Sequence, residues 1–362
     1  MNLSVCIIAK NEEKHIEKCM QCLSDKEVQI VVADTGSTDK TREIAKKYTE
    51  FVYDFKWIDD FGAAKQFAVS KASNDNILIL DCDEYLQSDK TVLEKLNSML
   101  ENEPPRAGRI KCINVLENDS KNTDWITRAF NRKYYKVEGK IHEQIVKADG
   151  EPADTFLSAV VIKHVGYALN DDEKKKKASR NIKLLKKRLT ELEKNFDSDI
   201  TQNNEKEIPY IYYQLGKSYY MEKDYNNACD FFSKGLSFDL EPKLEYVIDM
   251  VETYGYAMLN SGKVQEALSY TSIYDVFGNS ADFKFLMGLI YMKNAMFDEA
   301  VNEFQKAAEY KESRVEGANS YLAYYNIGVI YECLGNIGKA QEYYKKCNGY
   351  SKAVERLKNG KW

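Results

Sequence analysis

The chain has 362 residues, a hydrophobic fraction of 44% and a formal net charge of −5 at pH 7. This length predicts two or three domains with substantial hydrophobic cores, and the slightly acidic balance excludes a general nucleic-acid-binding protein. No run approaches the roughly 18 apolar residues of a membrane-spanning helix, and the N-terminus resembles a strand rather than a signal peptide. Eight scattered cysteines indicate reduced thiols, so we expect a cytoplasmic protein without a transmembrane segment.

The first 90 residues alternate between short apolar strands and amphipathic helices. Strands are predicted near 3–8, 30–33, 51–53 and 77–80, with helices between them. Alternation with short connections predicts a parallel sheet with right-handed crossovers. The carboxyl ends of such strands meet at one edge of the sheet, where ligands bind.

Three of these predicted strands end in polar residues, namely Asn11 and Glu12, then Asp34, then Asp81 with Asp83. Two aspartates spaced i, i+2 at a strand end can turn towards one divalent cation, which prefers oxygen ligands. The alternative is a polar turn that is merely acidic. Neither a glycine-rich dinucleotide motif nor a P-loop is present. A phosphate-bearing ligand here would therefore need a metal and basic side chains.

Three segments carry a resemblance to a known family. Residues 4–12 (SVCIIAKNE), 32–39 (VADTGSTD) and 80–84 (LDCDE) resemble, in order and in spacing, the signatures of family 2 glycosyltransferases of the GT-A fold. The resemblance implies an α/β, Rossmann-like nucleotide-sugar domain. It also implies an inverting hexosyltransferase that uses a nucleotide-diphosphate sugar, expected to be a UDP-sugar, together with Mn²⁺ or Mg²⁺.

The resemblance also implies roles for individual residues. Asp34 would accept hydrogen bonds from the base or ribose. In the DxD motif, Asp83 would hold the metal against the diphosphate, with Asp81 nearer the ribose or the metal, and Glu84 is expected to support the turn. Lys65 would meet a phosphate, or else be a solvated helix lysine. The residues expected to contact the nucleotide sugar are Ala9, Asn11, Glu12, Asp34, Lys65, Asp81 and Cys82.

The segment after the DxD motif is predicted to form the acceptor side of the crevice. Strands are expected at 109–115 and 159–167, and a short strand with basic residues at 127–132. An inverting transfer needs a base that deprotonates the acceptor, for which Glu143 is the candidate and His142 the rival. The alternative for either residue is an orienting group. His164, at a strand end, is expected to be a further metal ligand beside Asp83, or else a capping or supporting histidine.

The C-terminal half contains a repeat. Residues 171–207 are predicted to form a charged helical linker, whose lysine run is expected to be a solvated face. From residue 208 onwards, four units each place an alanine 12 residues after a glycine. This pattern resembles the tetratricopeptide repeat, an all-α solenoid. The second unit is degenerate, with Thr271 where an aromatic residue is expected.

The predicted organisation is therefore a GT-A glycosyltransferase domain over 1–170, a linker over 171–207 and tetratricopeptide-like repeats over 208–362. The chain looks similar to bacterial enzymes that glycosylate bacteriocin peptides. Stacked repeats present a concave surface for peptides, so we expect a peptide or protein acceptor, or a homodimer formed through the repeats. Two alternatives are open at this point. One is the same catalysis on a cell-surface or lipid-linked glycan, and the other is an inactive GT-A domain on a protein-binding scaffold.

Overall fold

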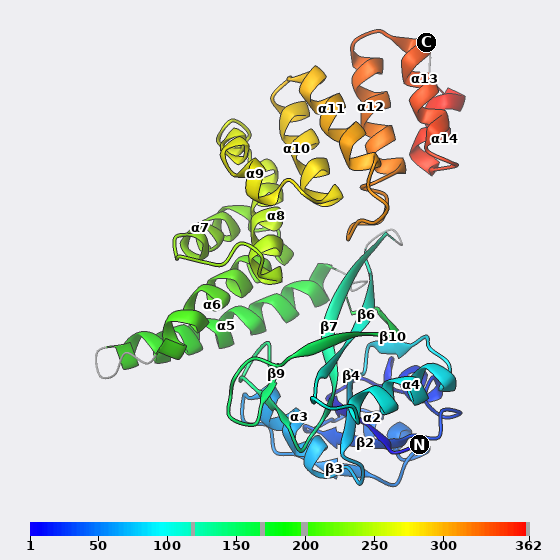
Figure 1. Ribbon diagram of the computed structural model, residues 1–362, viewed down its shortest axis with the longest axis vertical. Helices are drawn as coiled ribbons and strands as arrows, with labels where there is room; N and C mark the ends of the chain where they lie inside the picture. The colour runs from blue at the N-terminus through cyan, green and yellow to red at the C-terminus, as the bar shows by residue number, and fades with distance from the viewer. Residues whose placement is uncertain (117–119, 167–170, 197–201, 360–362) are drawn as a thin grey trace. The chain divides into compact units, whose positions relative to one another are not determined.

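The computed structural model describes residues 1–116, 120–166, 171–196 and 202–359 (Figure 1). The chain divides into two compact units, residues 1–169 and residues 170–362. The segment predicted as a linker belongs to the second unit, where Arg188 forms a two-pronged ion pair with Glu207 at 2.7 Å for each contact. Within the described ranges, no helix is both long and apolar enough to cross a membrane.

The first unit is an α/β domain with ten strands and four helices among its described residues. Its strands are β1 (Leu3–Ala9), β2 (Gln29–Asp34), β3 (Val52–Asp54), β4 (Asn76–Asp81), β5 (Glu84–Leu86), β6 (Ala107–Val115), β7 (Lys121–Asn131), β8 (Tyr135–Glu138), β9 (Gln144–Lys147) and β10 (Thr155–His164). Its helices are α1 (Ile16–Gln21), α2 (Thr41–Ala45), α3 (Phe61–Ser70) and α4 (Lys90–Leu100).

The main sheet has the strand order β3-β2-β1-β4-β7-β6-β10-β5, and β8 pairs with β9 in a separate ribbon. The strands β3, β2, β1 and β4 are parallel, as predicted. Beyond β4 the sheet is mixed, because β7 runs antiparallel to both β4 and β6, while β10 runs parallel to β6. The carboxyl ends of β1, β2, β4 and β10 therefore lie at the same edge of the sheet.

Both faces of this sheet are buried, which explains the continuous apolar runs of its strands. On β1, Leu3, Val5 and Ile7 pack on one face with residues of α1, α2 and α4. Cys6 points to the opposite face, where residues of α3 and β8 cover the sheet. Each fully buried leucine or isoleucine stabilises the fold by roughly 2 kcal/mol. The polar strand ends are thereby held on a rigid, two-sided core.

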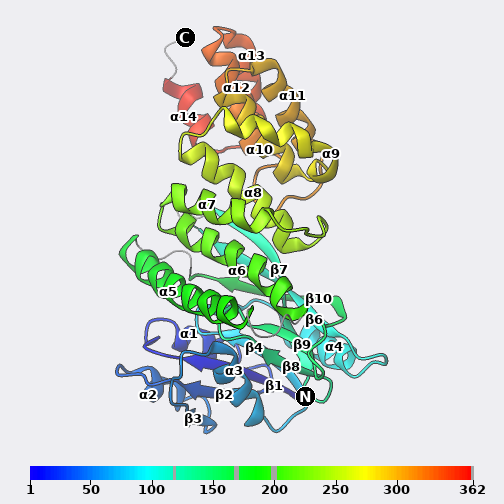
Figure 2. The same cartoon turned by 90° about the vertical axis from the view of Figure 1, so that its left-hand side faces the viewer.

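The second unit is all-helical (Figure 2). Successive helices pack side by side, notably α6 with α7, α10 with α11 and α12 with α13. Its helices are α5 (Asp171–Phe196), α6 (Gln202–Met221), α7 (Tyr225–Leu236), α8 (Glu245–Asn260), the 3₁₀ helix η2 (Glu266–Ile273), α9 (Tyr274–Phe277), α10 (Ala281–Lys293), α11 (Phe297–Ala308), α12 (Tyr321–Cys333), α13 (Ile337–Lys346) and α14 (Ser351–Asn359).

The repeat glycines allow paired helices to approach closely, as the sequence predicts. A β-carbon on Gly288 would lie 2.6 Å from the ring of Phe304, and one on Gly328 would lie 2.6 Å from the ring of Tyr344. In the degenerate second unit, the buried Tyr270 lies beside the corresponding glycine, and the α-helix expected there is replaced by η2. The small residue and its aromatic neighbour are thus a packing pair.

Candidate functional site

The loops after β1 and β2 bring together the residues predicted to form the nucleoside pocket. Ala9 and Asp34 are paired in the parallel ladder, and both are buried. The Asp34 carboxylate accepts hydrogen bonds from the Ser37 backbone N–H at 3.1 Å and from the Ser37 hydroxyl. Asn11 has a left-handed backbone (φ 55°), and its Oδ1 accepts from the Thr38 N–H at 2.7 Å. These contacts join the two loops into one surface.

Glu12 lies at the start of this loop pair and is also held by the second loop. Its backbone N–H donates to the Thr41 hydroxyl at 2.7 Å, which ties the β1–α1 connection to the N-terminus of α2. The sequence-predicted residues Ala9, Asn11, Glu12 and Asp34 therefore lie on one surface at the carboxyl edge of the sheet.

The acidic turn between β4 and β5 is stabilised by a hydrogen bond within it. The Glu84 carboxylate is buried and accepts from the Asp81 backbone N–H at 2.9 Å, as expected for a residue that supports the turn. The Cys82 side chain is 3% exposed, and its thiol donates to the Ile8 carbonyl at 3.3 Å. Burial raises the pKa of the Cys82 thiol well above its usual range. The Cys82 side chain is therefore part of the packing beneath the turn.

Two cations, the buried Lys65 and the partly buried Arg128, compensate part of this acidic cluster. The Lys65 ammonium lies 2.9 Å from Asp81 Oδ1 and 2.5 Å from Glu143 Oε1. The Arg128 guanidinium lies 3.0 Å from Asp81 Oδ2 and 2.8 Å from Glu84 Oε1. Burial alone would raise the pKa of Asp81, but Lys65 and Arg128 outweigh it and hold that pKa well below its usual range. For Glu84, burial prevails over Arg128 and raises the pKa.

Asp83 and His164 face each other at the same edge. The antiparallel β5–β10 ladder pairs His164 with Glu84, which places the imidazole beside the turn. His164 Nε2 lies 3.3 Å from Asp83 Oδ2. A β-carbon on Gly166 would lie 2.0 Å from Asp83 Oδ2 and 2.5 Å from His164 Nε2, so only a residue without a side chain fits beside this pair.

The donor set of this pair fits a divalent cation, because Mn²⁺ accepts both carboxylate oxygen and imidazole nitrogen. Within the described part of the chain, no group of three or more His, Cys, Asp or Glu side chains is arranged to hold a metal ion. Asp81, predicted as a third ligand, instead has both carboxylate oxygens engaged by Lys65 and Arg128. Asp83 and His164 would thus hold a cation that completes its coordination with substrate phosphate and water.

The segment that carries the two candidate bases docks against the start of α3. The Phe61 N–H donates to the Lys140 carbonyl at 2.8 Å, and the Gly62 N–H donates to the Gly139 carbonyl at 3.2 Å. His142 has a left-handed backbone (φ 54°), and Glu143, which follows it, points its carboxylate to Lys65. Of the two rival bases, Glu143 is therefore the one whose side chain joins the cluster.

Three residues of this site are not apparent from the sequence pattern. Arg128 was noted only as part of a basic strand, and Asn114 and Gly166 were not singled out. Their positions depend on the pairing of β4 with β7 and of β6 with β10, which no local pattern reveals. A signal did exist for Arg128, because a cluster of buried carboxylates requires a cation nearby.

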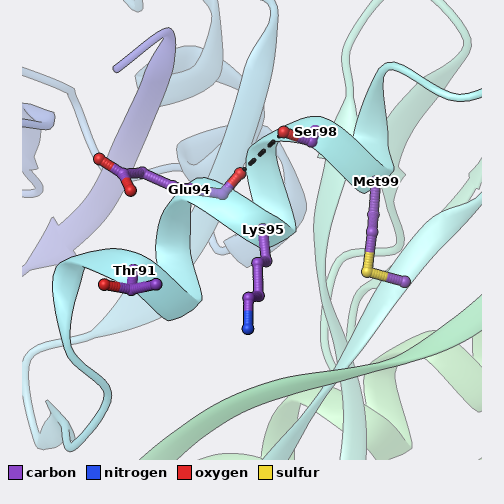
Figure 3. A pocket seen from close by; sticks show the side chains of 5 residues that line it. All are labelled: Thr91, Glu94, Lys95, Ser98 and Met99. Atoms are coloured by element: carbon purple, nitrogen blue, oxygen red, sulfur yellow. Dashed lines mark hydrogen bonds between the residues drawn. The ribbon is translucent and has the colours of Figure 1, made fainter.

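A surface hollow elsewhere on the first unit contains none of these residues (Figure 3). Its lining comes from the single helix α4, where Ser98 donates a hydrogen bond to the Glu94 carbonyl at 3.1 Å. We assign this hollow no role. Its lining residues are Thr91, Glu94, Lys95, Ser98 and Met99.

Comparison with known proteins gives matches for both units. Residues 4–165 match the Glycosyl transferase family 2 model, and residues 209–242, 281–314 and 321–353 match the Tetratricopeptide repeat model. The degenerate second unit lies outside these repeat matches. A TPR repeat-containing protein of Synechococcus elongatus is 22% identical over 348 residues, covering 94% of this chain and 73% of that protein.

Two glycosyltransferases match shorter stretches. The prophage-derived glycosyltransferase SunS of Bacillus subtilis is 30% identical over 191 residues, which are 51% of this chain and 44% of SunS. The lipopolysaccharide core biosynthesis glycosyltransferase LpsC of Rhizobium meliloti is 32% identical over 102 residues, which are 27% of this chain and 37% of LpsC. The matches thus span less than half the length of these two relatives.

Among solved structures, S. aureus TarS 1–349 aligns with a TM-score of 0.35 and 13% identity, covering 86% of this chain and 93% of that one. The two family matches define the organisation of the protein, and glycosyltransferases recur among its relatives. The chain thus carries a family 2 glycosyltransferase domain followed by tetratricopeptide repeats.

Proposed function

We propose that this chain is a metal-dependent, inverting glycosyltransferase that moves a sugar from a UDP-sugar to a side chain of a peptide or protein. The observation that carries the proposal is the division of the acidic turn into two parts. Asp81 and Glu84 are paired with Lys65 and Arg128, whereas Asp83 faces His164 beside Gly166. Asp81 and Glu84, which have cationic partners, would support the turn. Asp83 would be the carboxylate that binds a ligand.

Asp83 and His164 are the residues that would hold Mn²⁺ or Mg²⁺. When bound, the cation would neutralise the negative charge on the departing diphosphate. The protein contributes the Asp83 carboxylate, the His164 imidazole and a glycine at position 166, where a side chain would overlap the pair. Asp83 lies in the turn between β4 and β5, and His164 lies at the end of β10, which pairs with β5.

The nucleoside would bind where Ala9, Asn11, Glu12 and Asp34 meet. The Asp34 carboxylate would accept hydrogen bonds from the base or ribose, and its contacts with Ser37 hold it in that orientation. Asn11 is fixed by its contact with the second loop. The direction of the strands brings this pocket and the Asp83–His164 pair to the same edge of the sheet.

Lys65 and Arg128 would assist the diphosphate by neutralising the acidic turn. Without these cations, Asp81 and Glu84 would repel an incoming phosphate group. Lys65 is 3% exposed and engaged by two carboxylates, so its electrostatic effect reaches the donor without direct contact. This role differs from the direct phosphate contact that the sequence resemblance implies.

Glu143 is the proposed general base. It would accept the proton of the acceptor nucleophile as that nucleophile attacks the anomeric carbon from the face opposite the leaving diphosphate. The ion pair with Lys65 fixes the position of its carboxylate. Precise placement of a base contributes strongly to the rate, since a small displacement costs roughly 100-fold.

The tetratricopeptide repeats support a peptide or protein as the acceptor, because stacked repeats present an extended concave surface for such partners. The same surface would serve a second copy of the chain. We favour the acceptor role because the repeats share one chain with the transferase domain, and a tethered binding site raises the effective concentration of an acceptor.

The test is donor hydrolysis and peptide transfer measured with a panel of nucleotide sugars and Mn²⁺. Mass spectrometry would detect a sugar added to peptides, and chelation should abolish the signal. Asp83→Asn should lower turnover by at least about 100-fold. Asp25→Asn, on an exposed loop, is the matched control and should leave turnover unchanged. Full activity of Asp83→Asn, or insensitivity to chelation, would exclude the proposed metal role.

A further inference from the structure

The side chain of Asn114 bridges β7 and β10 beside the proposed metal pair. Asn114 is 3% exposed and lies on β6, directly paired with His164 on one side and with Asn122 on the other. Its Nδ2 is 2.7 Å from Asp124 Oδ2 and 2.7 Å from Asn122 Oδ1, while its Oδ1 is 2.8 Å from His164 Nδ1. The Cys112 thiol also donates to Asn114 Oδ1 at 3.4 Å.

The orientation of the Asn114 amide follows from its partners. The two ends of an asparagine amide are told apart only by the hydrogen bonds they make. A carboxylate can only accept hydrogen bonds, so the group that faces Asp124 must be the NH₂ donor. The Asn114 oxygen then faces His164, and His164 Nδ1 must carry the proton that it donates.

The proton on Nδ1 decides what the other ring nitrogen can do. In a neutral imidazole, one nitrogen carries the proton and the other presents a lone pair. In the neutral ring with its proton on Nδ1, the Nε2 lone pair then points to Asp83 Oδ2, 3.3 Å away. Two acceptors facing each other at this distance repel unless a positive charge lies between them.

We propose that Asp124 and Asn114 act as positioning residues that select the His164 tautomer protonated on Nδ1, and so present Nε2, together with Asp83, to a divalent cation. This inference rests on the proposed function in one respect, namely that His164 is a metal ligand. Partners that hold the second nitrogen of a ligating histidine commonly contribute 10–100-fold to metal affinity. These hydrogen bonds run from Asp124 on β7 through Asn114 on β6 to His164 on β10.

The chain suits a direct test, because it contains only three histidines. Full-length protein labelled with ¹⁵N at its imidazoles should give three pairs of ring-nitrogen signals, and His164→Gln would identify the pair of interest. Without metal, we expect the neutral form of His164 to carry its proton on Nδ1. Mn²⁺ affinity is measured separately by electron paramagnetic resonance, with and without UDP.

In Asn114→Leu, His164 should no longer favour the tautomer protonated on Nδ1. Mn²⁺ binding should weaken by about 10–100-fold. The double variant Asn114→Asp/Asp124→Asn exchanges the two side chains, so an oxygen still faces His164 and an NH₂ donor remains within the pair. It should recover the Nδ1-protonated tautomer and most of the affinity. Asn131→Leu is the matched control, since Asn131 is a largely buried asparagine of β7 that contacts Asn76 and should affect neither readout.

The outcomes separate the two hypotheses. If the unaltered chain binds no Mn²⁺ with or without UDP, the proposed metal-dependent function is wrong. If the chain binds Mn²⁺ but neutral His164 carries its proton on Nε2, the positioning role alone is wrong. Unchanged tautomer and affinity in Asn114→Leu would likewise overturn the positioning role, whereas rescue by the exchanged pair would support it.

Discussion

Lys65 and Glu143, 78 residues apart in the sequence, form an ion pair in which Lys65 Nζ lies 2.5 Å from Glu143 Oε1. The same ammonium contacts Asp81, so a single buried cation connects the proposed base to the acidic turn. Because Lys65 comes from α3 and Glu143 from the segment before β9, this contact joins these two parts of the site.

Replacing Lys65 by methionine should harm both stability and transfer. The substitution leaves Asp81 and Glu143 without their shared cation, and breaking a buried pair costs about 3–5 kcal/mol. Because Arg128 still compensates Asp81 and the Asp81 side chain is one-third exposed, we expect the lower end of this range. Urea denaturation measures the change in the free energy of unfolding. Lys56→Met, at an exposed position, should be neutral, and equal stabilities of the two variants would contradict the compensating role of Lys65.

The contact between Gly62 and Gly139 leads to a prediction about the base alone. A β-carbon on Gly62 would lie 2.4 Å from the Gly139 carbonyl oxygen, so Gly62→Ala must push the Glu143 segment away from α3. Peptide transfer should fall by about 100-fold, as expected for a displaced base. The affinity for Mn²⁺, measured by titration, should stay within about two-fold of the unaltered protein. A parallel loss of metal binding would show that the two halves of the site are not independent.

Gly166→Ala should have the complementary effect on the metal pair. The added β-carbon would overlap Asp83 Oδ2 and His164 Nε2, so these side chains must move apart. We expect Mn²⁺ affinity to fall at least about 10-fold. Gly338→Ala is the control, because a β-carbon on that helical glycine meets nothing within 4 Å and should stabilise α13 by roughly 1 kcal/mol. Retention of full Mn²⁺ affinity by Gly166→Ala would exclude a cation between Asp83 and His164.

The sequence predicted those parts of the site that sit within one strand and its following loop. The strand ends at Asp34 and Asp81 follow from apolar runs that stop at polar residues, and parallel alternation places those ends at one edge. Arg128 and Asn114 could not be placed in the same way. Arg128 lies on β7, an antiparallel strand inserted between β4 and β6, and Asn114 reaches the site through the pairing of β6 with β10. The register of such long-range pairing is set by tertiary packing.

In the repeats, too, local sequence spacing predicts some features, whereas others depend on long-range packing. The glycine and alanine positions predicted the helix pairs, because small residues at fixed spacing are needed for close helix contact. The 3₁₀ winding of η2 was not predictable from that spacing. Thr271 occupies the expected aromatic position, and Tyr270, one residue earlier, packs beside Gly255 in its place. Tertiary packing of the tyrosine decides the local conformation.

The second unit contains a buried carboxyl whose burial predicts a pH-dependent stability. Glu252 of α8 is 7% exposed, and its carboxylate lies 3.1 Å from Arg314 Nη1. Burial raises its pKa to about 8; Arg314 opposes this shift, while Asp282 and Asp249 reinforce it. The folded state therefore retains a proton on Glu252 at pH values where the unfolded chain, with an ordinary pKa of 4.5, has lost it.

The sign of the effect follows from proton linkage. Because the folded state binds the extra proton, the contribution of Glu252 to stability is fully present below about pH 4.5 and is lost as the pH rises towards 8. Glu252→Gln cannot titrate, so the difference in unfolding free energy between this variant and the unaltered chain should change by on the order of 2 kcal/mol between pH 5 and pH 8. The variant should gain relative stability at the alkaline end. Urea denaturation at pH 5, 6, 7 and 8 measures this difference, with Glu241→Gln as the exposed control. If the difference for Glu252→Gln is independent of pH, the carboxyl is ionised throughout this range, and Arg314, not burial, determines its charge.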